Sequence, residues 1–102
     1  MAFDIYAGER KDEIDYHEVI LFEYLADEFD NLPRLLEIWK QFYASPAFEP
    51  SASNELEHEL LFVRDKVVKS ESHKWLEPAL VRLTSFFSFA YRNKIKVQCA
   101  GD

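Results

Sequence analysis

Large apolar side chains recur at helical spacing along much of this chain, and this periodicity limits its possible folds more than any other feature. Apolar residues three and four positions apart share one face of an α-helix, and that face must be buried against other elements. The chain also holds only two glycines and four prolines, which disfavours a loop-rich β domain. The two clearest stripes are Leu56, Leu60, Val63 and Val67, followed by Leu76, Leu80, Leu83, Phe87 and Tyr91.

This pattern predicts a mainly α fold, a compact bundle of about four amphipathic helices in which residues 1–102 form a single helical domain. Good capping residues and first-turn prolines support several of the expected helix starts. A loop is expected over residues 44–54, with Phe48 tucked against the core. Four helices are predicted. The first covers residues 12–29, the second Leu32 to Tyr43 and the fourth residues 75–93, and the third begins after a cap at Ser53.

Both ends of the chain alternate apolar and polar residues, which is typical of short β-strands. We expect strands at residues 3–7 and 94–99. A lone pair of strands is only marginally stable, so these two must pack on the helices or pair across a dimer. They either pair with each other or pair across a homodimer.

The charge of the chain is strongly asymmetric. The net charge is −7. Residues 1–59 carry 15 acids against four bases, which gives −11, and residues 60–102 carry eight bases against four acids, which gives +4. A nucleic-acid-binding protein needs a basic footprint, and here the acidic part would repel phosphates. No nucleic-acid partner is therefore expected.

No catalytic or metal-binding motif is recognisable, so the chain is not expected to be an enzyme or to need a cofactor. Glu55 and His58 have the E-x-x-H spacing of di-iron bundles, but no second such pair follows. Cys99 is the only cysteine and is expected to be a buried, inert thiol. The roles of two residues stay open. His17 lies at the edge of an apolar stripe, and Glu18 lies within that stripe. Glu18 is either in exposed turns, in a structural salt bridge to a base such as Arg82 or Arg92, or a functional carboxylate.

The acids of the predicted first and third helices form the candidate binding surface. Opposed charge accelerates association and selects against wrong partners, and tyrosines among the acids could serve as anchors. The candidate partner-binding residues are Asp12, Glu13, Asp15, Tyr16, Glu23, Asp27, Glu28, Asp30, Glu55, Glu57 and Glu59.

These observations favour a small acidic protein-binding module. The first hypothesis is a bacterial inhibitor or immunity-type protein that masks a basic partner such as a toxin or nuclease, with carboxylates placed where substrate phosphates would bind. The alternative is a self-associating helical structural or regulatory protein without catalytic activity. Because the N-terminal sequence lacks a signal peptide and no stretch is long enough to span a bilayer, we expect a cytoplasmic protein without a membrane partner.

Overall fold

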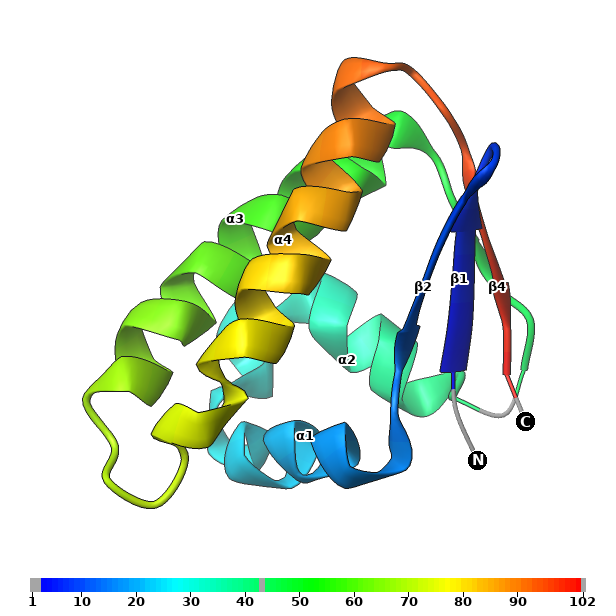
Figure 1. Cartoon of the computed structure of the whole chain (residues 1–102). Helices are drawn as coiled ribbons and strands as arrows, with labels where there is room; N and C mark the ends of the chain where they lie inside the picture. Colours follow the sequence, from blue (N-terminus) through cyan, green and yellow to red (C-terminus); the bar gives the residue numbers. More distant parts are fainter. Residues whose placement is uncertain (1–2, 43, 102) are drawn as a thin grey trace.

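The computed structural model describes residues 3–42 and 44–101, which combine a four-stranded antiparallel sheet with a set of helices (Figure 1). The prediction of a mainly α four-helix bundle is therefore wrong. The elements are β1 (Phe3–Ala7), β2 (Arg10–Ile14), η1 (Tyr16–Val19), α1 (Ile20–Tyr24), η2 (Ala26–Asn31), α2 (Pro33–Lys40), β3 (Ala47–Phe48), α3 (Pro50–Val68), η3 (Lys74–Leu76), α4 (Glu77–Arg92) and β4 (Val97–Ala100), where η denotes a 3-10 helix.

The strand order in the sheet is β2-β1-β4-β3, and all neighbours are antiparallel. The two terminal strands pair with each other within one chain, and Ile5 of β1 lies opposite Cys99 of β4. Both are inner strands, so neither offers a free edge to a second copy. Pairing of the terminal strands across a dimer is thereby excluded in this fold.

A β-hairpin occupies the place where the sequence suggested the start of a long helix. Gly8 has a φ of +62°, and Gly8-Glu9 forms the two-residue connection between β1 and β2. A glycine in the first position of such a connection supplies the backbone twist that joins two antiparallel strands tightly. The predicted helix over 12–29 therefore loses its first residues to β2.

The rest of that predicted helix is divided into three short helical pieces, η1, α1 and η2. Asp15 caps the first piece by accepting a hydrogen bond from the backbone of Tyr16, and Glu18 returns a bond to the backbone of Asp15. This reciprocal pair is a capping box. The side of this segment that faces the core is buried, and it consists of Leu21, Phe22 and Leu25.

Helix bounds in the middle of the chain also differ from the prediction. Helix α2 ends at Lys40, and Tyr43, once expected on its face, lies outside the described residues. Helix α3 begins at Pro50 rather than after a cap at Ser53. The fixed φ of proline suits the first helical position, and Ser53 is consequently buried inside the helix. Phe48 is buried as predicted, although it belongs to a short strand.

Helices α3 and α4 pack side by side and run in opposite directions (Figure 1). Helix α4 ends in a Schellman motif, in which the backbone N–H of Ile95 bonds to the carbonyl of Ala90 and that of Lys94 to Tyr91. Lys94 takes the left-handed conformation there, with a φ of +56°. This reversal directs the chain from the helix into β4.

The core lies between one face of the sheet and the helices. Phe3, Ile5 and Val97 point inward from the strands, and the apolar stripes of α3 and α4 meet them. No helix among the described residues is both long enough and apolar enough to cross a membrane.

Candidate partner-binding surface

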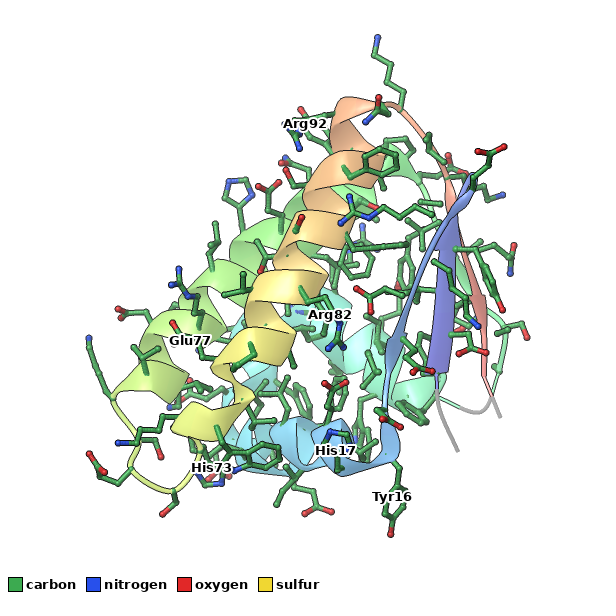
Figure 2. The ribbon with its side chains drawn as sticks, in the orientation of Figure 1. Tyr16, His17, His73, Glu77, Arg82 and Arg92 are labelled. Carbon is green, nitrogen blue, oxygen red and sulfur yellow. The ribbon has the colours of Figure 1, made fainter. Side chains whose placement is uncertain are left out.

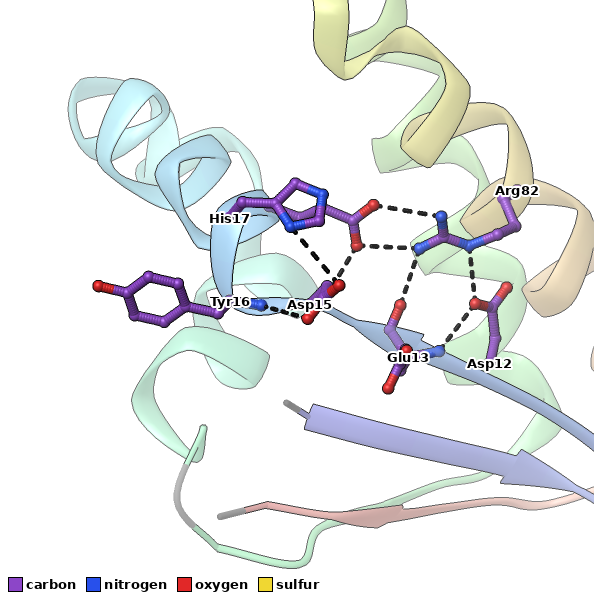
Figure 3. Close-up of polar contacts among 7 residues, drawn as sticks. Asp12, Glu13, Asp15, Tyr16, His17 and Arg82 are labelled. Atoms are coloured by element: carbon purple, nitrogen blue, oxygen red, sulfur yellow. Dashed lines mark hydrogen bonds and ion pairs between the residues drawn. The ribbon is translucent and has the colours of Figure 1, made fainter. Parts of the chain in front are cut away.

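Arg82 of α4 holds two of the predicted acidic binding residues against the body of the protein (Figure 3). Its Nε atom donates to Asp12 at 2.7 Å, and Nη2 donates to the backbone carbonyl of Glu13 at 2.8 Å. Nη1 and Nη2 also donate to the carboxylate of Glu18, at 3.2 and 3.0 Å. The hydrogen bond to Glu18 is the main reason that the pKa of Arg82 is raised.

This network answers the question about Glu18. The side chain is buried, with 7% of the residue exposed, and it is neither in an exposed turn nor free. It serves as the structural partner of Arg82 and as part of the capping box of η1. A buried carboxylate needs this kind of pairing to stay ionised. Asp12 and Glu18 are therefore structural residues, and they fix β2 and η1 to α4.

Two further predicted binding residues are paired with cations of the same chain. Glu28 of η2 accepts a hydrogen bond from Lys66 of α3 at 2.6 Å, which raises the pKa of the lysine. Glu55 of α3 bonds to Arg34 of α2, which raises the pKa of the arginine. Both pairs connect α3 to the segments that cross it, so these carboxylates have a role inside the protein.

Glu59 of α3 caps helix α2 from outside that helix. Its two carboxylate oxygens accept the backbone N–H groups of Arg34 and Leu35, at 3.0 and 2.9 Å. Helix α2 has no side-chain cap of its own, and the first N–H groups of a helix need an acceptor. Burial raises the pKa of Glu59, and the two backbone hydrogen bonds oppose this shift without cancelling it. Glu59 is thus also a structural residue.

Five of the ten predicted acidic residues have carboxylates that make no hydrogen bond or ion pair among the described residues, although the charge of one of them, Asp27, contributes to the raised pKa of Lys66. These five do not form one continuous face. Glu13 lies on the edge strand β2, and Glu57 lies on α3. The other three, Glu23, Asp27 and Asp30, lie together on the segment that contains α1 and η2.

These three acids continue an exposed row that begins with Tyr16 and Ile20, and we call the five residues the outward stripe. Its members follow each other at intervals of three and four residues, opposite the buried residues of the same segment. Tyr16 is 72% exposed and Ile20 is 40% exposed. Figure 2 shows Tyr16 pointing away from the body of the protein. A shallow hollow lies beside Tyr16, Ile20 and Glu23.

Phe62 of α3 is an exposed aromatic residue that the sequence argument did not single out. It is 52% exposed and lines a mainly apolar hollow with Leu32, His58 and Asn31. Asn31 directly follows Asp30, so this hollow adjoins the acidic end of the outward stripe. The signal was available in the sequence, because Phe62 falls outside the apolar stripe of its own helix.

The histidines and the cysteine that the sequence offered for chemistry each have different neighbours in the described part of the chain. His17 is exposed, lies 3.5 Å from Asp15 and stacks on Trp75. His58 is exposed and contacts the backbone carbonyl of Asn54. No cluster of three metal-ligating side chains occurs within residues 3–42 and 44–101. Cys99 is buried as predicted, and burial raises the pKa of its thiol to about 12.

The outward stripe is thus the part of the predicted surface that keeps both free carboxylates and exposed aromatic or aliphatic anchors. Comparisons with protein-family models, with curated proteins and with solved structures gave no match to this chain.

Proposed function

We propose that the protein is a small acidic binding module whose outward stripe, Tyr16, Ile20, Glu23, Asp27 and Asp30, docks a basic protein partner. The observation that supports this proposal is the combination on one segment of three carboxylates that make no hydrogen bond or ion pair among the described residues and two exposed apolar anchors. Charge placed around an aromatic anchor is typical of protein interfaces. The proposed compartment is the cytoplasm.

The charge balance of the segment supports a basic partner. The carboxylates of Asp12 and Glu18 share Arg82, and that of Glu28 pairs with Lys66. Those of the outward stripe form no ion pair among the described residues. A cationic partner would gain ion pairs at its rim without breaking any pair inside this protein. The surface of a nuclease that binds phosphates has the required charge, so an immunity-type inhibitor of a toxin or nuclease is the specific form of the proposal.

The backbone of this segment fits a binding role as well. Residues 16–31 are built from two 3-10 helices and a single short α-helix, and 3-10 helices have weaker hydrogen-bond geometry than α-helices. The segment is fixed from behind by Arg82 and by the stacking of Tyr24 on His73, with ring centroids 4.0 Å apart. Its exposed side can therefore adjust locally while its position on the body is maintained.

The test is affinity capture of the partner with the purified protein and two matched variants. The first variant carries Asp27→Lys and Asp30→Lys on the outward stripe. The control carries Glu9→Lys and Glu49→Lys, which make the same change in net charge. The β1–β2 turn and the start of α3, where these two residues lie, are at the end of the molecule away from α1 (Figure 1). Both variants should keep the circular dichroism spectrum of the wild type.

We expect the outward-stripe variant to lose the partner and the control to retain it. Because the attraction is electrostatic, higher salt should also slow association by one or more orders of magnitude. Equal capture by the wild type and by the Asp27→Lys/Asp30→Lys variant would overturn the proposal, as would association that does not respond to salt.

A further inference from the structure

The hollow beside Phe62 lies where η2 meets helix α3. Its volume is about 480 Å³, which is within the range of about 300–1,000 Å³ that is typical of binding pockets. Lys66, one turn further along α3, bonds to Glu28 of η2 and holds the two segments together. We call the site the Phe62 hollow, and the residues that line it are Asn31, Leu32, His58, Glu59 and Phe62.

Phe62 gives this hollow an accessible aromatic face. The residue is 52% exposed, and no cation of the described residues lies over its ring. Other rings of the protein do carry a cation of the same chain, since Lys66 lies over Tyr24 and Arg10 over Phe89. The face of an aromatic ring attracts cations, arginine more often than lysine. The ring of Phe62 is therefore available for a cation that another molecule supplies.

The charges around the hollow leave negative charge in excess. Residues 24–39 and 51–69 reach two helical turns beyond the lining residues, and they contain eight acids against four lysines or arginines. All four bases are paired with acids of the same chain: Arg34 with Glu37 and Glu55, Arg64 with Glu77, Lys66 with Glu28, and Lys69 with Asp65.

Two of the remaining acids belong to the hollow or adjoin it. Glu59 lines the hollow, and among the described residues it accepts backbone hydrogen bonds and forms no ion pair. Asp30 directly precedes Asn31 and belongs to the outward stripe. The remaining titratable group is His58, whose Nδ1 contacts the carbonyl of Asn54. The hollow thus combines an apolar wall with a local excess of carboxylates.

We propose that the Phe62 hollow receives one arginine side chain of the basic partner, an inference that rests on the proposed function of the outward stripe. The apolar stem of the arginine covers the wall of the hollow, and its planar guanidinium stacks on the ring of Phe62. An aliphatic side chain would leave the excess negative charge unmatched. Lysine carries the charge, but its compact ammonium group cannot stack flat on a ring.

The first test titrates the isotope-labelled protein with acetyl-arginine amide, which is a single arginine side chain without a protein, at constant chloride concentration. The backbone NMR signals of Asn31, His58 and Phe62 should shift together. Acetyl-citrulline amide has the same stem and an uncharged end group, and it should bind about threefold more weakly or worse. The Phe62→Ala variant should lower the response to arginine amide to a similar extent. Equal binding of the two amides, or the absence of shifts at these three residues, would contradict the inference.

The second test compares Phe62→Ala with Leu61→Ala in the capture of the partner. Leu61 is the matched control, because it is 44% exposed on the same helix and lines the hollow toward α4 instead. Phe62→Ala should raise the dissociation constant of the partner about tenfold, whereas Leu61→Ala should leave it unchanged. Equal dissociation constants for the two variants would refute the arginine site.

The arginine site and the outward stripe fail in different ways. If Asp27→Lys/Asp30→Lys abolishes capture and Phe62→Ala does not weaken it, the outward stripe is supported and the arginine site is refuted. If arginine amide shifts the signals of the hollow but capture does not respond to the Asp27→Lys/Asp30→Lys change, the arginine site is supported and the docking role of the outward stripe is refuted.

Discussion

The Arg82 network allows a quantitative prediction for the variant Arg82→Met. Methionine keeps the length and much of the apolar stem of arginine and removes the guanidinium. The substitution deletes hydrogen bonds to Asp12, Glu18 and the carbonyl of Glu13. It also leaves the buried carboxylate of Glu18 without a cation. We therefore expect Arg82→Met to be one of the most destabilising changes on the surface of the protein.

The size of the loss follows from the exposure of the partners. Removing one member of a fully buried ion pair costs about 3–5 kcal/mol, and exposed pairs contribute about 1 kcal/mol or less. Glu18 is 7% exposed, whereas the side chain of Arg82 is 42% exposed. Water can therefore replace part of the hydrogen bonding that the guanidinium provides. We expect the free energy of unfolding to fall by about 2–3 kcal/mol, which corresponds to a decrease in Tm of about 10–20 °C for a domain of this size.

Urea denaturation at neutral pH measures this loss directly. Arg92→Met is the matched control, because Arg92 lies on the same helix and, among residues 3–42 and 44–101, makes only one long hydrogen bond, of 3.4 Å, to the backbone of Ser88. The control should change stability by less than about 0.5 kcal/mol. Adding Glu18→Gln to Arg82→Met should recover part of the loss, since a neutral amide costs less to bury. Equal effects of Arg82→Met and Arg92→Met would refute the role given to the network.

Three further substitutions test the local structure. Burial raises the pKa of Glu59 above its ordinary 4.5, so its contribution to stability is complete below that value and is lost as the pH rises through the folded pKa. The stability of the wild type relative to Glu59→Gln, measured by urea titration, should therefore fall as the pH rises above about 4.5. Lys94→Gly should stabilise the protein by about 0.5–1 kcal/mol, because glycine adopts a positive φ without strain. Ser53→Ala should not destabilise and should raise Tm, since the buried hydroxyl of Ser53 has no hydrogen-bond partner in the structure; a lower Tm would contradict this.

The helices with the clearest periodicity could be predicted from the sequence. The stripes of α3 and α4 each span several turns, and their aliphatic residues, such as Leu60 and Leu83, are buried, whereas Tyr91 at the end of the predicted α4 stripe is 43% exposed. Phe48 and Cys99 were correctly expected in the core. In these cases local spacing alone decides which side chains are buried, so no knowledge of distant contacts was needed.

The N-terminal hairpin was missed because its second strand resembles a helix start. Strand β2, Arg10–Ile14, carries four charged residues and only one buried apolar residue, Ile14. An edge strand has this composition because one of its sides and its outer edge face water. The acids Asp12 and Glu13 also suit the first turn of a helix. The two-residue connection that starts at Gly8 was the stronger signal, since it places the next strand against β1.

The division of the acids into paired and free residues could not be predicted from the sequence. Arg82 lies 70 residues from Asp12 and 64 from Glu18, and only the packing of α4 against β2 brings them together. The same holds for Glu59, which caps a helix that begins 26 residues earlier, at Pro33. Four of the eleven candidate residues belong to the outward stripe, and its fifth member, Ile20, was not a candidate. The fold was therefore needed to select the members of the stripe.

Hydrogen–deuterium exchange of the captured complex tests the central claim most directly. The account predicts slower exchange of backbone amides in residues 16–31 when the partner is bound, with the largest change between Ile20 and Asp30. The inner strands β1 and β4, which are already hydrogen-bonded on both sides, should change little. Protection confined to other surfaces, with unchanged exchange across residues 16–31, would contradict the assignment of the outward stripe as the partner-binding surface.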